Sequence, residues 1–206
     1  MVHYGLSAGL GQFFMNAPET SCLYQLGNFL FPAGQVDSDL WQEFSKKYSL
    51  ADKVIISEES SWQEFLDGQS ELGQFTRYAF ADKVAFDTEA LEKLQSRLPA
   101  NYYLCPIDEE SYERLAEEVW SQDLQGDFVD FDHFQAAGGF GFLLYSGEEI
   151  IAAVSTGLVY HGALEIEIST KPAYQRQSLA KILGARMILE AQKRSLFPLW
   201  DAHNEA

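Results

Sequence analysis

The clearest alternation of hydrophobic and polar positions lies near the end of the chain. Across residues 163–170, leucine and isoleucine alternate with glutamate and serine, which predicts a strand with one buried face. Apolar residues then recur at spacings of three and four, which predicts a long helix that buries Leu179, Ile182, Leu183, Met187 and Ala191. Lys193 and Arg194 suit the negative end of that helix, and residues 197–202 are typical of a further buried strand.

Weaker periodicities divide the rest of the chain into shorter elements. Helices are predicted at 38–48, 61–68, 88–98 and after Asp108. Ser61 and Glu64 have the spacing of a capping box. In the helix after Asp108, the residues expected to face the core are Tyr112, Leu115, Val119 and Trp120. Strands are predicted at 53–56, 74–80, 101–106, 142–145 and 150–160. Glycine and proline interrupt the first 34 residues repeatedly, so a short helix and a loop-rich region are expected there. Pro99 marks the expected boundary between an N-terminal α/β region, 1–98, and a second domain, 99–206.

The turn between the strand at 163–170 and the following helix has a chemical use. Several backbone N–H groups at the start of a helix lack an intrahelical partner and point to one place, which suits a pyrophosphate. The order Gln175-x-x-Ser178-x-Ala180 resembles the coenzyme A pyrophosphate loop of the GNAT N-acetyltransferases, in which Gln or Arg is followed by two residues, Gly, one residue, and Gly or Ala. Ser178 stands where that family usually has its central glycine.

This resemblance implies a fold and a cosubstrate. The implied fold is α/β (α+β), with a GNAT-like mixed, largely antiparallel sheet flanked by helices and preceded by the N-terminal region; the whole chain looks most like the group that includes zwittermicin A resistance-type acetyltransferases. The helix and two strands that usually end the fold are expected to be missing. The residues expected to contact acetyl-CoA are Ile168, Ser169, Thr170, Gln175, Arg176, Gln177, Ser178, Leu179, Ala180, Lys181 and Asn204.

The implied activity is N-acetylation of a small amine, with the amine attacking the thioester directly. Such a site must remove a proton from an ammonium group, and Glu165 and Glu167 lie two apart on one face of the strand beside the expected cofactor cleft. Either carboxylate can act as the general base, directly or through water, and Glu167 is preferred because it is nearer the thioester end. The other interpretation of the pair is a solvated strand face.

Composition narrows the class of protein. The 206 residues include 47% hydrophobic residues, enough for a real core, and the formal net charge of −17 argues against a nucleic-acid partner. No stretch approaches the length of a membrane span and no secretory signal is visible, so a cytoplasmic location is expected. Cys22 and Cys105 are expected to be reduced, buried thiols.

Several alternatives stay open at this stage. Phe128, Phe131 and Phe134 recur every three residues and form either core or an acceptor-pocket wall, with core favoured. Two groups offer metal ligands, Asp130 with Asp132 and His133, and Asp201 with His203, but no metal site is expected. The serine in the loop motivates a rival hypothesis, a catalytically impaired GNAT-like binding or interaction module. The strand at 197–202 needs a cover, either the N-terminal region or a second copy in a homodimer.

Overall fold

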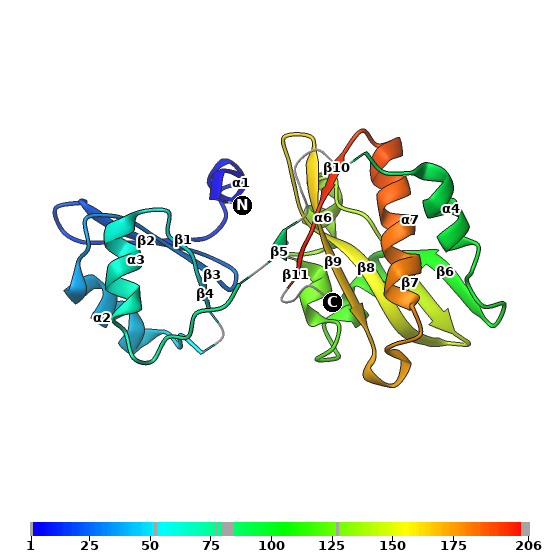
Figure 1. The fold of residues 1–206 in the computed structure, drawn as a ribbon, viewed down its shortest axis with the longest axis horizontal. Helices are drawn as coiled ribbons and strands as arrows, with labels where there is room; N and C mark the ends of the chain where they lie inside the picture. Colours follow the sequence, from blue (N-terminus) through cyan, green and yellow to red (C-terminus); the bar gives the residue numbers. More distant parts are fainter. Residues whose placement is uncertain (1, 52, 77, 80–84, 127, 203–206) are drawn as a thin grey trace. The chain divides into compact units, whose positions relative to one another are not determined.

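A computed structural model describes residues 2–51, 53–76, 78–79, 85–126 and 128–202 of the chain (Figure 1). The chain divides into two compact units, Met1–Phe75 and Thr76–Ala206. The expected boundary at residue 98 differs from this division. Residues 76–98 belong with the second unit because helix α4, Thr88–Gln95, packs along helix α7, Leu179–Lys193.

The first unit contains a four-stranded sheet in the order β1-β2-β3-β4. Its strands are β1 (Gln12–Met15), β2 (Ser21–Leu26), β3 (Phe29–Gly34) and β4 (Val54–Ile55), preceded by α1 (Val2–Ala8). The expectation of a loop-rich region across the first 34 residues was therefore wrong. Strands β2 and β3 form a tight antiparallel hairpin, and Gly27 at its turn has φ 54°, a conformation that glycine adopts without a steric penalty.

Two helices cover one face of this sheet. Helix α2 (Ser38–Lys47) buries Leu40, Trp41 and Phe44, as predicted, and packs them against Trp62 of helix α3 (Ser60–Asp67). The predicted capping box at Ser61 and Glu64 was wrong, because α3 begins one residue earlier and its N-cap is Glu59, which makes no side-chain cap hydrogen bond.

The second unit is built on a five-stranded sheet in the order β10-β9-β8-β7-β6. The strands are β6 (Tyr102–Pro106), β7 (Gly141–Ser146), β8 (Glu149–Tyr160), β9 (Ala163–Thr170) and β10 (Phe197–Leu199). Neighbouring strands pair antiparallel except β9 and β10, which are parallel. This confirms the predicted mixed, largely antiparallel sheet. A separate pair, β5 (Tyr78–Ala79) and β11 (Asp201–Ala202), joins residues far apart in sequence.

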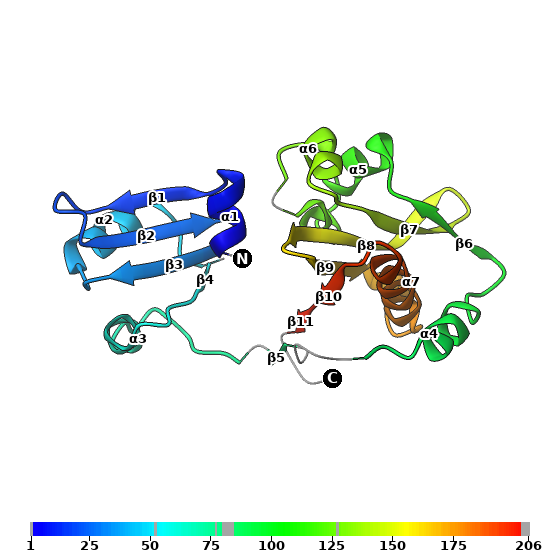
Figure 2. The same cartoon turned by 90° about the horizontal axis from the view of Figure 1, so that it is seen from above.

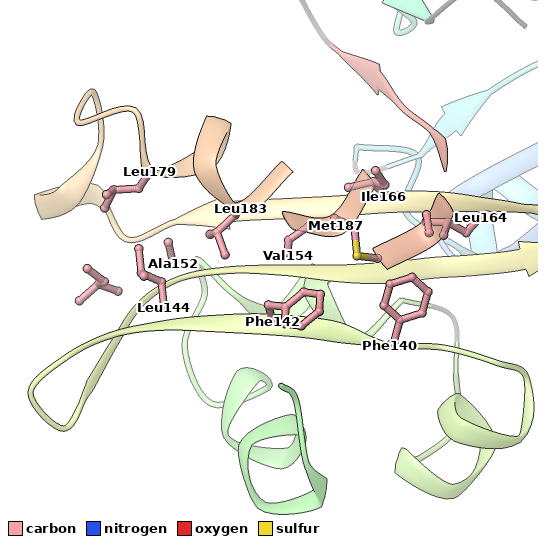
Figure 3. Packing of buried hydrophobic residues seen from close by; sticks show 12 residues of the cluster. Phe140, Phe142, Leu144, Ala152, Val154, Leu164, Ile166, Leu179, Leu183 and Met187 are labelled. Atoms are coloured by element: carbon pink, nitrogen blue, oxygen red, sulfur yellow. The ribbon is translucent and has the colours of Figure 1, made fainter. Parts of the chain in front are cut away.

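Helices cover both faces of the five-stranded sheet (Figure 2). Helices α4 and α7 lie on one face, whereas α5 (Glu109–Leu115), η1 (Gln122–Gln125) and α6 (Phe131–Ala136) lie on the other. All five apolar positions predicted for the last helix are buried in α7. Figure 3 shows Leu179, Leu183 and Met187 of this helix packed over Leu144, Val154 and Ile166 of the sheet.

The helix after Asp108 starts as predicted but ends early. Asp108 and Ser111 form a reciprocal capping box, so the helix begins at Glu109. It ends at Leu115, and Val119, which was expected to face the core, is 84% exposed. Phe128 and Phe134 are buried with Tyr112, so these two rings of the aromatic triplet are core residues.

The strand at 197–199 is partly covered within its own unit, and Leu199 remains 37% exposed. The Phe197 ring lies 6.0 Å from the Phe86 ring, and Trp200 packs against the cluster under α7. Part of the cover therefore comes from residues before 98, as one of the two hypotheses required. Within the described part of the chain, no helix is both long and apolar enough to cross a membrane.

Candidate active site at the edge of β9

Strands β9 and β10 stop pairing after Glu165. The parallel pairing of β10 with β9 covers only Ala163, Leu164 and Glu165, while β9 continues to Thr170. Beyond Trp200 the chain pairs with β5 instead, as β11. Among the described residues, no strand pairs with the outer edge of residues 166–170. The backbone N–H and C=O groups on the edge of a strand can bind an extended ligand.

The loop after β9 contains two residues with a strained backbone conformation. Arg176 and Ser178 have φ values of 62° and 63°, in the left-handed region that residues with a side chain rarely adopt. Strain of this kind costs on the order of 1–2 kcal/mol per residue and clusters at ligand-binding sites. The central position of the expected Gln175-x-x-Ser178-x-Ala180 loop therefore requires the backbone conformation for which glycine is usual.

Helix α7 starts directly after this loop. Ser178 is its N-cap but makes no side-chain cap hydrogen bond, and the first helical bond runs from Ile182 N–H to the Ser178 carbonyl at 3.3 Å. The N–H groups of the first turn therefore have no carbonyl partner four residues earlier within the helix. Leu179 is 2% exposed, so only its backbone can reach a ligand. This combination of free N–H groups and positive helix dipole attracts an anion.

Charge near the loop is divided between bound and available cations. Lys171 forms ion pairs with Glu118 at 3.0 Å and Glu149 at 2.9 Å. Hydrogen bonds with these two carboxylates raise the Lys171 pKa, and the same contacts hold the pKa values of both glutamates below their usual range. Arg176 and Lys181 are exposed, and the described part of the chain offers neither an ion pair. They are the cations available to a bound phosphate.

Polar groups at the end of β9 hold the loop in place and leave one hydroxyl unused. The Gln175 side-chain amide donates to the Thr170 carbonyl at 3.1 Å, and Tyr102 Oη donates to Gln177 Oε1 at 3.5 Å. Ser169 Oγ donates to the Trp120 carbonyl at 2.6 Å. Thr170 Oγ1, in contrast, is buried with no hydrogen-bond partner among the described residues. A buried hydroxyl without a partner is unusual and fits an acceptor or donor supplied by a ligand.

Glu165 and Glu167 lie on the sheet face opposite α7. Both are half-buried and alternate with Leu164 and Ile166, which pack under α7. Strand β8 has a β-bulge at Gly157, opposite this pair. A Cβ added to Gly157 would lie 3.1 Å from Cγ and 3.3 Å from Oε1 of Glu167. The bulge therefore makes room for the Glu167 carboxylate.

The turn after η1 packs closely against the same bulge. Gly126 follows η1 with φ 63° and ψ −156°, a region almost limited to glycine, and an added Cβ would lie 2.7 Å from the Gly157 carbonyl oxygen. Reciprocal hydrogen bonds of 2.8 Å between Tyr112 and Gln125 anchor this turn. Burial, the largest effect, raises the pKa of Tyr112 to about 12, so its hydroxyl stays protonated and continues to donate.

The structure therefore brings most of the predicted site residues together at one end of the β9–α7 connection. Asn204, and His203 of the second metal hypothesis, lie outside the described residues. Asp130 accepts from the His133 N–H at the start of α6, and His133 Nδ1 accepts from the Val129 N–H. The described residues hold no group of three or more His, Cys, Asp or Glu side chains that could bind a metal.

Sequence reasoning missed two features of this site. The network of Lys171, Glu118 and Glu149 joins residues too far apart in sequence for any local pattern to connect them. The bulge at Gly157 had a readable signal, because an isolated glycine inside a predicted strand often marks a bulge or a close approach.

Comparison with known proteins identifies the family. The model of the GNAT acetyltransferase family matches residues 1–206. The chain belongs to this family. Its members are N-acetyltransferases, so the chain is an enzyme of that class. No curated protein gives a significant match.

Solved structures show the same architecture. The chain is similar to a GCN5-related N-acetyltransferase-like protein from Streptococcus suis 89/1591, with 29% sequence identity and a TM-score of 0.83 over 97% of this chain and 81% of that one. A GCN5-related N-acetyltransferase from Kribbella flavida has 13% identity and a TM-score of 0.57 over 97% of this chain and 82% of that one, which shows the fold alone.

Proposed function

We propose that this GNAT family member transfers an acetyl group from acetyl-CoA to the amine of a small molecule, at the edge of β9 beyond its pairing with β10. The observation that carries the proposal is that β10, among the described residues, pairs only with Ala163, Leu164 and Glu165, while β9 continues to Thr170 and the loop before α7. An extended chain of amide groups, such as the pantetheine arm, suits the edge of a strand because it can continue the sheet's hydrogen bonding.

The residues present fit a pyrophosphate and the arm attached to it. Free N–H groups at the first turn of α7, the left-handed Arg176 and Ser178, and the side chains of Arg176 and Lys181 would hold the phosphates. The unpartnered hydroxyl of Thr170, together with the backbone of Ile168 and Ser169, would contact the arm. Acetyl-CoA supplies an activated thioester, which an amine can attack without a covalent enzyme intermediate.

The acidic face of β9 is suited to the proton transfer. An amine arrives at neutral pH mainly as an ammonium ion and must lose a proton before it can attack a carbonyl. Glu167 lies beside the bulge at Gly157 and Glu165 lies two residues earlier on the same face. Either carboxylate accepts the proton directly or through water, and Glu167 is our preferred base because it lies further along the strand toward the loop.

Calorimetric titration with acetyl-CoA tests the binding half of this proposal. The wild-type protein should bind with a micromolar dissociation constant, and Arg176→Gln should weaken binding by about ten-fold because it removes a cation beside the phosphates. Lys193→Gln is the matched control, since Lys193 is an exposed cation at the other end of α7. Absence of heat from the wild-type protein at high micromolar acetyl-CoA would contradict the proposal.

A further inference from the structure

A second concavity lies at the other end of helix α7. A cavity of about 390 Å³ opens between the turn that joins α6 to β7 and the C-terminal half of α7. The residues that line it include Phe131, Phe134, Phe140 and Phe142, and Figure 3 shows Phe140 and Phe142 side by side on the sheet beneath α7. Small-molecule sites commonly have a volume of this order and combine an apolar wall with a few polar groups.

The polar groups of this cavity come from one face of α7. Arg186, Glu190 and Arg194 are spaced four residues apart, so successive turns of the helix present them together. The Glu190 carboxylate lies 3.5 Å from a terminal nitrogen of Arg186 and 3.1 Å from Nε of Arg194. Two cations and one anion give the cluster a net charge of +1 in a chain whose formal net charge is −17.

Aromatic rings hold both guanidinium groups in place. Cζ of Arg186 lies 4.3 Å from the centre of the Phe142 ring, and Cζ of Arg194 lies 4.0 Å from that of Phe140. Stacking of this kind orients the planar group and leaves its N–H edges free to bind. A guanidinium group has five N–H donors, and Glu190 is the only carboxylate partner of either arginine among the described residues.

The backbone N–H groups of Gly138, Gly139 and Phe140, which line the cavity, already have acceptors. The N–H groups of Gly138 and Gly139 already bond to the carbonyls of Gln135 and Phe134, at 2.9 and 2.8 Å, and the Phe140 N–H bonds to Thr156 Oγ1 at 3.2 Å. The two arginines are therefore the charged donors that a ligand in the cavity would meet, and the Gln135 side-chain amide is a neutral one. An anionic group satisfies them, and the phenylalanine rings favour an apolar body attached to it.

We propose that this cavity binds a small carboxylic acid with an apolar, preferably aromatic, body, at a site separate from the acyl-transfer site. The carboxylate takes the free edges of Arg186 and Arg194, as planar guanidinium groups favour. The apolar body lies against Phe131, which lines the same cavity and is only partly buried, and against the ring edges of Phe140 and Phe142. Eight residues, about 12 Å of helix, separate Arg186 from the loop at Ser178, so both sites can be occupied together.

The test compares 3-phenylpropionate with its neutral amide, 3-phenylpropionamide, by ligand-observed NMR titration of the full-length protein. The acid should bind at least about ten-fold more tightly than the amide. R194Q should remove most of this preference, and its side chain is exposed enough for the fold to tolerate the change. R186Q should act in the same direction, whereas K193Q, an exposed neighbour on α7 that does not line the cavity, should change nothing.

E190Q decides between binding and a purely structural role. If the cluster binds acids, removing the competing carboxylate should tighten 3-phenylpropionate binding several-fold, opposite in sign to the arginine variants. Weaker binding by E190Q, equal binding of acid and amide, or no saturable binding at about 10 mM would each overturn the proposal. Saturating coenzyme A should leave the acid's dissociation constant unchanged, and competition would overturn the separate site. A failure of coenzyme A itself to bind concerns only the proposed function.

Discussion

Gly157 of β8 and Glu167 of β9 are packed so closely that a single methyl group would disturb them. The space where a Gly157 Cβ would stand lies 3.1 Å from Glu167 Cγ, closer than such contacts normally are. The bulge at Gly157 removes one residue from the pairing between β8 and β9, and Gly126 holds the bulge from its other end. The position of the proposed base therefore depends on two glycines that carry no chemistry themselves.

Gly157→Ala should lower turnover by about ten-fold or more, because the added methyl displaces the Glu167 carboxylate by several tenths of an ångström. Acetyl-CoA affinity, measured by calorimetry, should stay within about two-fold, since the loop at α7 is untouched. Gly184→Ala is the control: an added Cβ at Gly184, inside α7, meets nothing within 4 Å. That variant should keep full turnover and unfold at a higher temperature, by roughly 0.5–1 kcal/mol in stability. Equal turnover in both variants would show that Glu167 does not need this space.

Replacing both Glu165 and Glu167 by glutamine should lower turnover at neutral pH while acetyl-CoA affinity survives, because a general base acts on the amine and not on the nucleotide. A panel of primary amines with a thiol-release assay measures turnover. Raising the pH should partly restore activity, since more of the acceptor is then deprotonated without help. Unchanged turnover in the double variant would place the base elsewhere or leave the task to water.

Ser178→Gly should stabilise the protein by about 1 kcal/mol and tighten coenzyme A binding, because glycine occupies the left-handed conformation at φ 63° without a steric penalty. Ser178→Ala is the matched variant, which keeps the Cβ and loses only the hydroxyl. Since Ser178 makes no side-chain cap hydrogen bond, the alanine variant should change stability little. Chemical denaturation and calorimetry measure the two effects, and an alanine variant as stable as the glycine one would show that backbone strain is not the cause.

As the pH is lowered, the Lys171→Gln variant should lose less of its unfolding free energy than the wild type does. Contacts with Lys171 are the main reason that the pKa values of Glu118 and Glu149 are lowered in the folded protein. A carboxyl group whose pKa is lower in the folded than in the unfolded protein stabilises the fold at pH values above its unfolded-state pKa, which is about 4.3 for Glu. That stabilisation is lost as the pH falls through the pKa of the folded state. Urea midpoints at pH 6, 4.5 and 3 should therefore fall less steeply for Lys171→Gln than for the wild type. Lys181→Gln, which removes an exposed cation without an ion pair among the described residues, should keep the wild-type slope.

Features that depend on residues close together in the sequence were the ones that could be predicted. The five apolar positions of α7 are all buried as expected, because a 3.6-residue period over a long helix is set by the chain itself. The order of strand, turn and helix from residue 163 to residue 193 could be predicted for the same reason, because these elements are consecutive in sequence. The hairpin at Gly27 was missed because its short strands are apolar on both faces, with Tyr24 and Phe31 on one face and Leu23 and Leu30 on the other, which hides the alternation.

Features that depend on contacts between distant parts of the chain could not be predicted from the sequence. Nothing near Lys171 indicates that Glu118 and Glu149 neutralise it, and nothing near Arg186 indicates that Phe142 lies under its guanidinium group. The contacts of Glu149 and Phe142 exist because the sheet order places β7, β8 and β9 side by side beneath α7. The contact of Glu118 exists because the segment between α5 and η1 lies against the end of β9, where Ser169 bonds to the Trp120 carbonyl. The expected boundary at Pro99 differs from the division after Phe75 for the same reason, since α4 joins the second unit through α7, which follows it by more than eighty residues.

The pairing of β5 with β11 also sets an order for events on the ribosome. Tyr78 and Ala79 pair with Ala202 and Asp201, so this pair cannot form until residue 202 has been made. The strands and helices of the first 75 residues, in contrast, pack with one another and can fold while the rest is still being translated. Helix α4 must likewise wait for α7, the helix against which it packs, so its packing is completed only after residues 179–193 have been made.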